Sequence, residues 1–463
     1  MPMPSRVASS RLAAHRFRLG SVAALLTALA LPLTAHSGPA AAGDAPAAGA
    51  AGRLTDSVAA TPPTARPARW TSRSSERSLI AALNAATVAL SPRSGSAEAA
   101  MSTTAARPAG AELGPVVRTG GRLVAKSDAS QAAERLLGRG HTRYETRHWV
   151  VYSDADVAWS RAQTGRLERT VHEFERVMGR LGITPDPLRH KLVCVLFERR
   201  ADYRQFASEA DGVTAEWVAG YYSPSADRTV FYHAETNPSV IRARAKLAEL
   251  EGELSGLESD ITDARRRGDE RRERDLMRWR DEYKSHLGGE RKRIDAFSDE
   301  VGIATTVHEA THQLLFHRGV QSTMFQQPLW ISEGLATAFE TDDPSAAFGP
   351  DHEYPSRRDR FAELMDDGAL LDTRELVTWL EVPVGRDGDI DVLYHQSYAL
   401  TTWLFHRHRP QLRNFLAALR SRDGIDARSA LDLFEASFGP VETVERRWLQ
   451  DERRQLRRVV RGG

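Results

Sequence analysis

The spacing of hydrophobic residues in the middle of the chain alternates between that of strands and that of helices. Apolar residues dominate Thr146–Asp154 and Lys191–Phe197, which predicts two strands. The second run is apolar throughout, as is typical of a strand buried on both faces. Between them, apolar positions recur every three or four residues up to Gly182, which predicts a helix that ends there. Two short apolar runs, Trp217–Tyr222 and Thr229–His233, are expected to form a β-hairpin.

The hydrophobic spacing changes between Val240 and about Leu287. Apolar residues, mostly leucines, now alternate steps of three and four, and charged residues fill the other positions. This pattern predicts two helices that fold back on each other near Gly268 as an antiparallel coiled coil. We expect this hairpin, residues 238–290, to be an insertion that projects from the domain. It is either a spacer or a surface that binds a protein partner.

The rest of the chain has a mostly helical pattern. Helices are expected at Ser298–Arg318, Leu329–Glu340, Ser356–Asp366, Thr373–Leu380, Val392–His408, Gln411–Ser421, Ala427–Phe438 and Val441–Arg457. A strand-rich part followed by a helical part predicts an α+β fold. We assign residues 116–463 to one domain that contains the coiled-coil insertion.

The first 115 residues are expected to lie outside this domain. Four arginines precede the apolar stretch Leu19–Ser37, which is typical of a signal peptide over residues 1–37. An uncleaved membrane anchor is the alternative, although the stretch is short for a span and contains Pro32. Residues 38–115 are rich in Ala, Pro, Gly, Ser and Thr and predict a disordered tether. We therefore expect export to the periplasm, envelope or medium, with no stable membrane anchor after cleavage.

Charge and cysteine content exclude two classes of protein. The formal net charge is +1, so nucleic acid is not an expected partner. Cys194 is the only cysteine, which excludes an intrachain disulfide framework. Since it lies inside an apolar run, we expect a buried and unreactive thiol.

The stretch TTVHEATHQLLFH, Thr305–His317, contains the candidate chemistry. On a helix, His308 and His312 lie one turn apart and project the same way, so both can reach one ion at about 2.0–2.1 Å. Glu309 is placed to reach a water on that ion, as a general base must. The motif also occurs by chance, and the alternative is a surface helix with two partly exposed histidines.

A third metal ligand is expected in PLWISEGLATAFE, Pro328–Glu340. Catalytic zinc takes three protein ligands and leaves one position for water. Glu333 follows His312 by enough residues to finish one helix and bring a second helix beside it, and Gly334 is expected to let these two helices pack closely. The alternative for Glu333 is a capping or solvated carboxylate near a helix N-terminus.

The segments HEATH and WISEGLA together resemble the gluzincin metallopeptidases, the group that contains thermolysin-like peptidases and related aminopeptidases. The similarity covers about Thr142–Phe438 and is nearest to uncharacterised bacterial domains of that group. It implies that His308, His312 and Glu333 bind Zn²⁺ and that Glu309 is the base. It also implies a small mixed sheet packed on the active-site helix, followed by a helical lobe.

The segment VLYHQSYALTTWLFHR, Val392–Arg407, resembles the helix on which this group has a tyrosine that stabilises the oxyanion. The matching position is Tyr394, with Tyr398 one turn later as the second choice. The alternative is that both tyrosines are packing residues. His395 projects elsewhere on the helix and is not expected to be a ligand.

The sequence differs from the gluzincin pattern in two respects. No Gly-rich exopeptidase motif precedes the metal helix, so the resemblance does not extend to aminopeptidase specificity. Thr337 occupies the place of an aspartate that orients a histidine in the thermolysin branch, so Glu340 or Asp342 is expected to do this instead. The hairpin ending at Thr229–His233 is either a strand that binds extended substrate or a simple sheet edge.

These expectations describe an exported zinc-dependent hydrolase that acts on peptide or protein substrates. Two other classes remain open. One is a zinc-binding protein with weak catalysis that works through its coiled-coil hairpin. The other is an envelope structural or interaction protein whose HExxH segment binds no metal.

Overall fold

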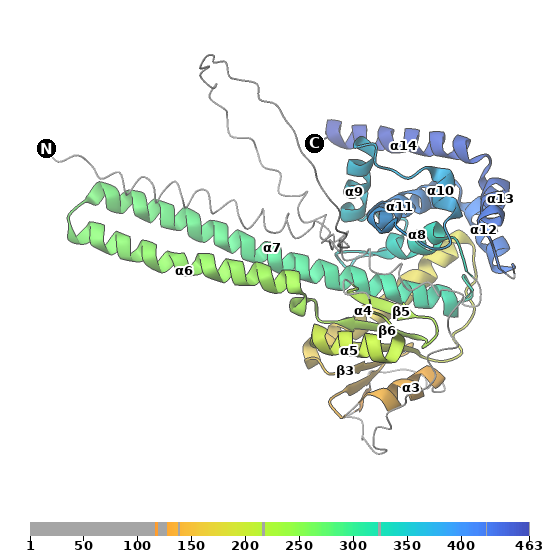
Figure 1. Cartoon of the computed structure of the whole chain (residues 1–463), viewed down its shortest axis with the longest axis horizontal. Coiled ribbons are helices and arrows are strands. Elements are labelled where there is room, and N and C mark those ends of the chain that lie inside the picture. Colours follow the sequence, from red (N-terminus) through yellow and green to blue (C-terminus); the bar gives the residue numbers. More distant parts are fainter. Residues whose placement is uncertain are drawn as a thin grey trace, which may run out of the picture.

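The computed structural model is a mixed α+β structure, as expected (Figure 1). It describes residues 116–118, 127–137, 139–214, 218–322, 326–422 and 424–462. The expected signal peptide and the whole of the expected tether, residues 38–115, lie outside these residues. In the part that the structure describes, no helix has the length and apolar character needed to span a bilayer.

One sheet has its strands in the order β1-β2-β3-β4-β6-β5. The strands are β1 (Val116–Arg118), β2 (Thr142–Glu145), β3 (Trp149–Ser153), β4 (Leu192–Phe197), β5 (Gly220–Ser223) and β6 (Arg228–Tyr232). The central strands β3, β4 and β6 run parallel, whereas β2 and β5 run antiparallel to their neighbours β3 and β6. The sheet is therefore mixed.

Strand β4 has every residue buried and pairs on both sides, because its uninterrupted apolar run suits a strand covered on both faces. Cys194 in this strand is fully buried, and burial raises the pKa of its thiol to about 12. The β-hairpin is present, but the edge strand is β5. The hairpin that the sequence suggested as a substrate-binding edge or a simple sheet edge thus lies at one end of the sheet, while its second strand, near Thr229–His233, is paired on both sides.

Two layers of helix cover the sheet. One face packs on α4 (Val157–Leu181) and on the second half of α7 (Glu270–His317). The other face packs on α3 (Asp128–Leu136) and α5 (Arg200–Asp211). Neither β2 nor α3 was predicted from the sequence, since both are short and rich in polar residues. This arrangement puts the sheet directly against the helix that contains the HExxH motif.

The charged region forms a long helical hairpin of α6 (Pro238–Arg266) and α7, which extends well beyond the rest of the molecule (Figure 1). Two small apolar clusters hold its arms together, separately from the main core. The expected separate helices ending at Leu287 and starting at Ser298 are one continuous helix. The N-terminal part of α7, which forms one arm of the hairpin, and the HExxH segment therefore belong to the same helix.

A helical lobe follows α7. It comprises α8 (Leu329–Phe339), α9 (Pro355–Asp366), α10 (Thr373–Thr378), α11 (Ile390–Arg407), α12 (Arg409–Arg420), α13 (Ala427–Phe438) and α14 (Val441–Gly462). Gly334 on α8 packs against α11, where an added Cβ would lie 2.7 Å from the Ser397 carbonyl oxygen and would also overlap Thr401. The expectation that Gly334 faces the HExxH helix was wrong: its missing side chain lets α8 approach α11.

Candidate metal centre

Helix α7 supplies the first two candidate ligands. His308 and His312 lie one turn apart, and their Nε2 atoms are 3.1 Å from each other. Both side chains are buried, as is Glu309 between them. The helix can be buried here because the residues around the motif are small, apolar or uncharged, and the sheet and α8 cover them. The alternative of two exposed histidines on a surface helix does not describe this structure.

Helix α8 brings the third candidate ligand to the same point. Glu333 Oε2 lies 3.3 Å from His308 Nε2 and 3.5 Å from His312 Nε2. The three donor atoms therefore form a nearly equilateral triangle. In a tetrahedron whose centre lies about 2.0–2.1 Å from each corner, as in zinc sites, the corners are about 3.3–3.4 Å apart. The triangle matches one face of such a tetrahedron, which leaves one corner for a further ligand.

The donor chemistry also fits a cation. His308 Nδ1 lies 2.8 Å from Glu340, which accepts a hydrogen bond from it and leaves the Nε2 lone pair directed at the triangle. Glu333 Oε2 is buried and has no hydrogen-bond partner among the described residues. Lone pairs of two imidazoles and a carboxylate at these distances repel unless a proton or a metal ion lies between them. These three side chains could therefore hold a metal ion.

The buried charges around the three donor atoms also favour a bound cation. Burial lowers the pKa of His308, but the surrounding carboxylates outweigh burial and raise it to about 10. Burial raises the pKa of Glu333, but the two histidines outweigh it and hold the pKa well below its usual range. In the absence of a cation, a protonated His308 and the buried guanidinium of Arg357 balance two of the three buried carboxylates Glu309, Glu333 and Glu340. A divalent cation that displaces the proton from His308 would balance the third.

Glu340 links the triangle to a buried arginine. Its oxygens accept from Arg357 Nε and Nη2, both at 2.7 Å, while Oε1 also accepts from His308. Burial raises the pKa of Glu340, and Arg357 and His308 outweigh it and lower the pKa. Of the two carboxylates that the sequence suggested for orienting a histidine, the structure places Glu340 there. Thr337 instead bonds the Glu333 carbonyl within its own helix.

The sequence analysis missed Arg357 as a part of this centre, and it considered His395 only as a residue that is not a ligand. Arg357 is fully buried and lies over the ring of Tyr394, at 5.4 Å from the ring centre. His395 accepts from Arg357 at 3.3 Å and donates from Nδ1 to the Asp391 carbonyl. His395 therefore supports Arg357 and lies outside the ligand triangle. No motif surrounds Arg357 in the sequence, because its partners Glu340 and His395 are distant in the chain.

Glu309 faces the edge of the sheet. The backbone N–H of Tyr222, on the edge strand β5, donates to Glu309 Oε2 at 2.8 Å. This bond fixes the carboxylate beside the ligand triangle without making Glu309 part of it. A carboxylate in this position can take a proton from a water held at the open corner.

The two candidate tyrosines have different surroundings. The ring of Tyr394 lies 5.8 Å from that of His308, beside the ligand triangle. The hydroxyl of Tyr398 accepts the backbone N–H of Tyr354 at 3.0 Å, which commits it to holding the start of α9. Of the two, Tyr394 is the one that lies against a candidate ligand.

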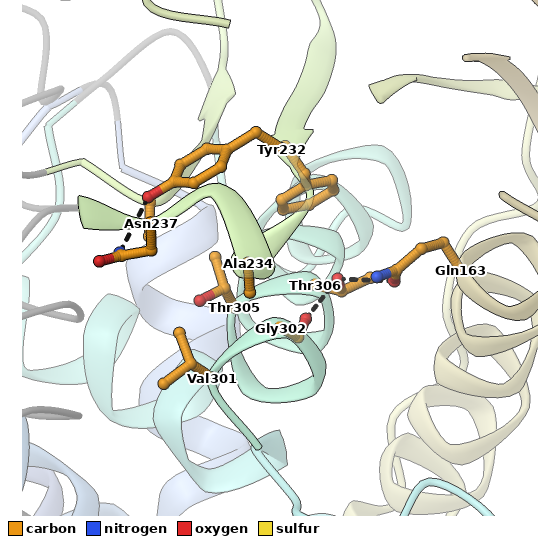
Figure 2. A pocket seen from close by; sticks show the side chains of 10 residues that line it. Gln163, Tyr232, Ala234, Asn237, Val301, Gly302, Thr305 and Thr306 are labelled. Carbon is orange, nitrogen blue, oxygen red and sulfur yellow. Dashed lines mark hydrogen bonds between the residues drawn. The ribbon is translucent and has the colours of Figure 1, made fainter. Parts of the chain in front are cut away.

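The centre is closed in this conformation. His308, Glu309, His312, Glu333 and Tyr394 are each at most 5% exposed. A small cavity adjoins the metal helix, lined by Gly302 and Thr305 of α7 and by Gln163 and Tyr232 from α4 and β6 (Figure 2). Its volume is about 10 Å³, which is room for a single water. This cavity is too small to be a substrate pocket.

A comparison with protein families matches residues 302–426 to a family described only as a protein of unknown function (DUF1570). The matched segment contains the candidate ligands, Glu309, Glu340, Arg357 and Tyr394, but not Tyr222. No curated protein matches the chain. The comparisons thus mark this region as one that recurs among proteins, and they name no activity for it.

Proposed function

We propose that this protein is an exported zinc metallopeptidase of the gluzincin type. The observation that supports this most strongly is the triangle of His308, His312 and Glu333, whose sides of 3.1, 3.3 and 3.5 Å match one face of a zinc tetrahedron. The second support is Glu309 beside the triangle but outside it. A purely structural zinc site has four protein ligands and no need of such a base.

The residues would divide the reaction among them. Zinc held by His308, His312 and Glu333 would lower the pKa of a bound water to near 7 and polarise the carbonyl of the scissile bond. Glu309 would accept a proton from the attacking water and deliver it to the departing amine nitrogen. The hydroxyl of Tyr394 would donate to the oxyanion of the substrate.

The edge strand suggests how an extended peptide would bind. Among the described residues, β5 pairs as a strand only with β6 and is the last strand of the sheet on that side. The same strand touches Glu309 through Tyr222. A peptide added along β5 would place its backbone next to the base, with affinity supplied by main-chain hydrogen bonds.

Digestion of a mixed, proteome-derived peptide library tests this proposal. We expect the wild type to generate new peptide termini and a chelator to abolish them. Glu309→Gln should retain zinc and lose cleavage. The exposed Glu282 lies on the same helix, so Glu282→Gln is the matched control and should cleave as the wild type does. Cleavage by zinc-loaded Glu309→Gln at the wild-type rate would contradict the proposal.

The closed centre favours a second candidate, a zinc-binding protein with weak catalysis that acts through the α6–α7 hairpin. Every proposed site residue is at most 5% exposed, whereas the hairpin extends far from the body. In that case zinc would stabilise the C-terminal part of α7, where the HExxH segment lies. Removal of the part of the α6–α7 hairpin that projects from the body would abolish partner binding and leave the zinc content unchanged. Undetectable cleavage by zinc-loaded wild type together with such a loss would favour this candidate.

A further inference from the structure

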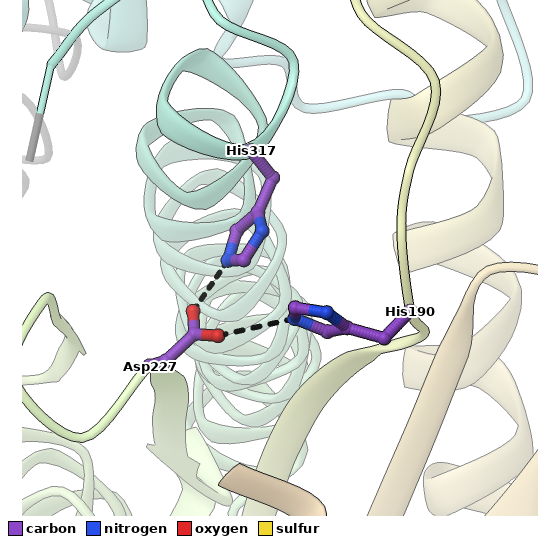
Figure 3. A group of neighbouring side chains, drawn as sticks. All are labelled: His190, Asp227 and His317. Atoms are coloured by element: carbon purple, nitrogen blue, oxygen red, sulfur yellow. Dashed lines mark hydrogen bonds and ion pairs between the residues drawn. The ribbon is translucent and has the colours of Figure 1, made fainter. Parts of the chain in front are cut away.

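A second group of metal-binding side chains lies at the far end of α7. His317 is the last residue of α7, His190 lies on the loop before β4, and Asp227 lies in the turn between β5 and β6 (Figure 3). One donor atom from each lies within 4.8 Å of the other two. All three side chains are partly exposed, in contrast to the buried centre. These residues come from three separate segments and play no part in the function proposed above.

Asp227 joins the two histidines. Its Oδ1 lies 2.5 Å from His317 Nε2, and its Oδ2 lies 3.4 Å from His190 Nε2. The centres of the two imidazole rings are 5.1 Å apart, and the rings are nearly perpendicular. Both rings direct Nε2 to the carboxylate of Asp227. Asp227 has a backbone φ of 51°, the left-handed conformation that is uncommon outside glycine. The turn therefore holds an unusual conformation at the residue that faces both histidines.

We propose that His190, Asp227 and His317 form a second site for a divalent cation of the zinc type. Two imidazoles and one carboxylate are a ligand set that zinc accepts, with water completing the tetrahedron. In the present arrangement a hydrogen bond joins Asp227 and His317, with its proton between the two side chains. A cation would replace this proton and separate the two atoms to about 3.3 Å, the edge of a zinc tetrahedron. Asp227 lies in a turn and its side chain is partly exposed.

The surroundings leave room for the ion and its water. His190 and Asp227 line an open hollow of about 710 Å³ between α3 and the β5–β6 turn. Three arginines line the same hollow. Arg228 is bound to Asp211, and Arg135 and Arg189 are exposed, so that solvent screens their charges. The second site has the same ligand types as the buried centre but is more exposed, so we expect weaker binding there.

A cation at this position would connect the edge strand to α7. The hydroxyl of Tyr222 donates to Asp227 Oδ1 at 3.3 Å, and the backbone N–H of the same residue donates to Glu309. The second site is thus one residue away from the proposed base. A cation bound there would link the β5–β6 turn to the C-terminal end of α7 and hold β5 in place beside the buried centre.

Zinc stoichiometry of the full chain tests this inference. The protein is stripped with a chelator, dialysed against a series of buffered free zinc concentrations, and analysed for bound metal. We expect two equivalents in the wild type and one in both His190→Ala and His317→Ala. His352→Ala, which removes a histidine that belongs to neither group, should keep two equivalents. A wild type that binds one equivalent, or a His317→Ala variant that still binds two, would overturn the inference.

A variant of the buried centre separates this inference from the proposed function. His312→Ala should retain one weakly bound equivalent, which a further His317→Ala substitution should remove. If the wild type binds one equivalent that only His312→Ala removes, the second site is refuted and the buried centre stands. If the one equivalent is lost only in His317→Ala, the buried centre fails as a zinc site and the second site stands.

Discussion

Glu340 makes the sharpest test of how the buried centre is built, through the substitution Glu340→Gln. Both carboxylate oxygens accept hydrogen bonds: Oε1 from His308 and Arg357, and Oε2 from Arg357 alone. An amide at this position must turn its NH₂ group toward one of these donors. If the NH₂ faces His308, it favours the tautomer with the proton on Nε2, which blocks the lone pair that a metal needs. If it faces Arg357 Nε, two donors oppose each other.

The expected size of the effect follows from burial. Glu340 and Arg357 are both fully buried, so the substitution leaves an uncompensated guanidinium close to the metal position. Removing one partner of a buried ion pair costs about 3–5 kcal/mol of folding free energy. Loss of the partner that orients a metal-binding histidine typically lowers metal affinity by about 10–100-fold. We therefore expect both a less stable protein and weaker zinc binding.

Two assays separate these effects. Urea denaturation of the metal-free protein gives the change in stability, and competition with a chelator of known affinity gives the zinc dissociation constant. Glu375→Gln is a matched control, because Glu375 is bonded to Arg386 in a surface pair, and both side chains are more than a third exposed. That control should change stability by at most about 1 kcal/mol and leave zinc affinity unchanged. A Glu340→Gln variant with unchanged zinc affinity would refute the reasoning that Glu340 sets the tautomer of His308.

Three further predictions follow from the same structure. Gly334→Ala should lower the free energy of unfolding by about 1–3 kcal/mol and weaken zinc binding, because the added Cβ would overlap α11. Gly165 lies at an exposed position of α4 with open space around it, so Gly165→Ala should instead stabilise the protein in the same urea assay. Tyr394→Phe should slow peptide cleavage by about 10²–10³-fold with zinc retained, whereas Tyr398→Phe should lower stability by about 0.5–1.5 kcal/mol with little effect on rate. Burial raises the pKa of Asp351, but its partner Arg176 on α4 outweighs burial and lowers the pKa. The contribution of this carboxylate to folding stability is therefore complete above about pH 4 and is lost as the pH falls further. Asp351→Asn should lower stability at neutral pH and make stability decline less steeply in acid.

The local parts of the site were predictable because short spacings determine them. A helix places residues four apart on one face, so His308 and His312 had to project together once the segment was helical. Glu333 was reachable by the same reasoning, since a helix after a short connection packs beside the one before it. The apolar run of β4 likewise indicated a strand covered on both faces.

Long-range partners were not predictable in the same way. Arg357 reaches Glu340 only because α9 folds back over the end of α8, and no sequence spacing encodes that approach. Gly334 was correctly expected to allow a close approach, but the neighbour is α11 and not the metal helix. The continuity of α7 was missed because packing against α6 and the sheet outweighs local breaks in its pattern. His190, Asp227 and His317 lie in three segments that only the tertiary fold brings together.

The convergence of His308, His312 and Glu333 on one ion is the claim on which the account depends. Zinc K-edge absorption of the His317→Ala variant, which lacks the second site, tests it most directly. We expect one retained zinc with four nitrogen or oxygen neighbours at about 2.0–2.1 Å, two of them imidazoles. Purified protein without zinc, or a spectrum without imidazole scattering, would contradict the account.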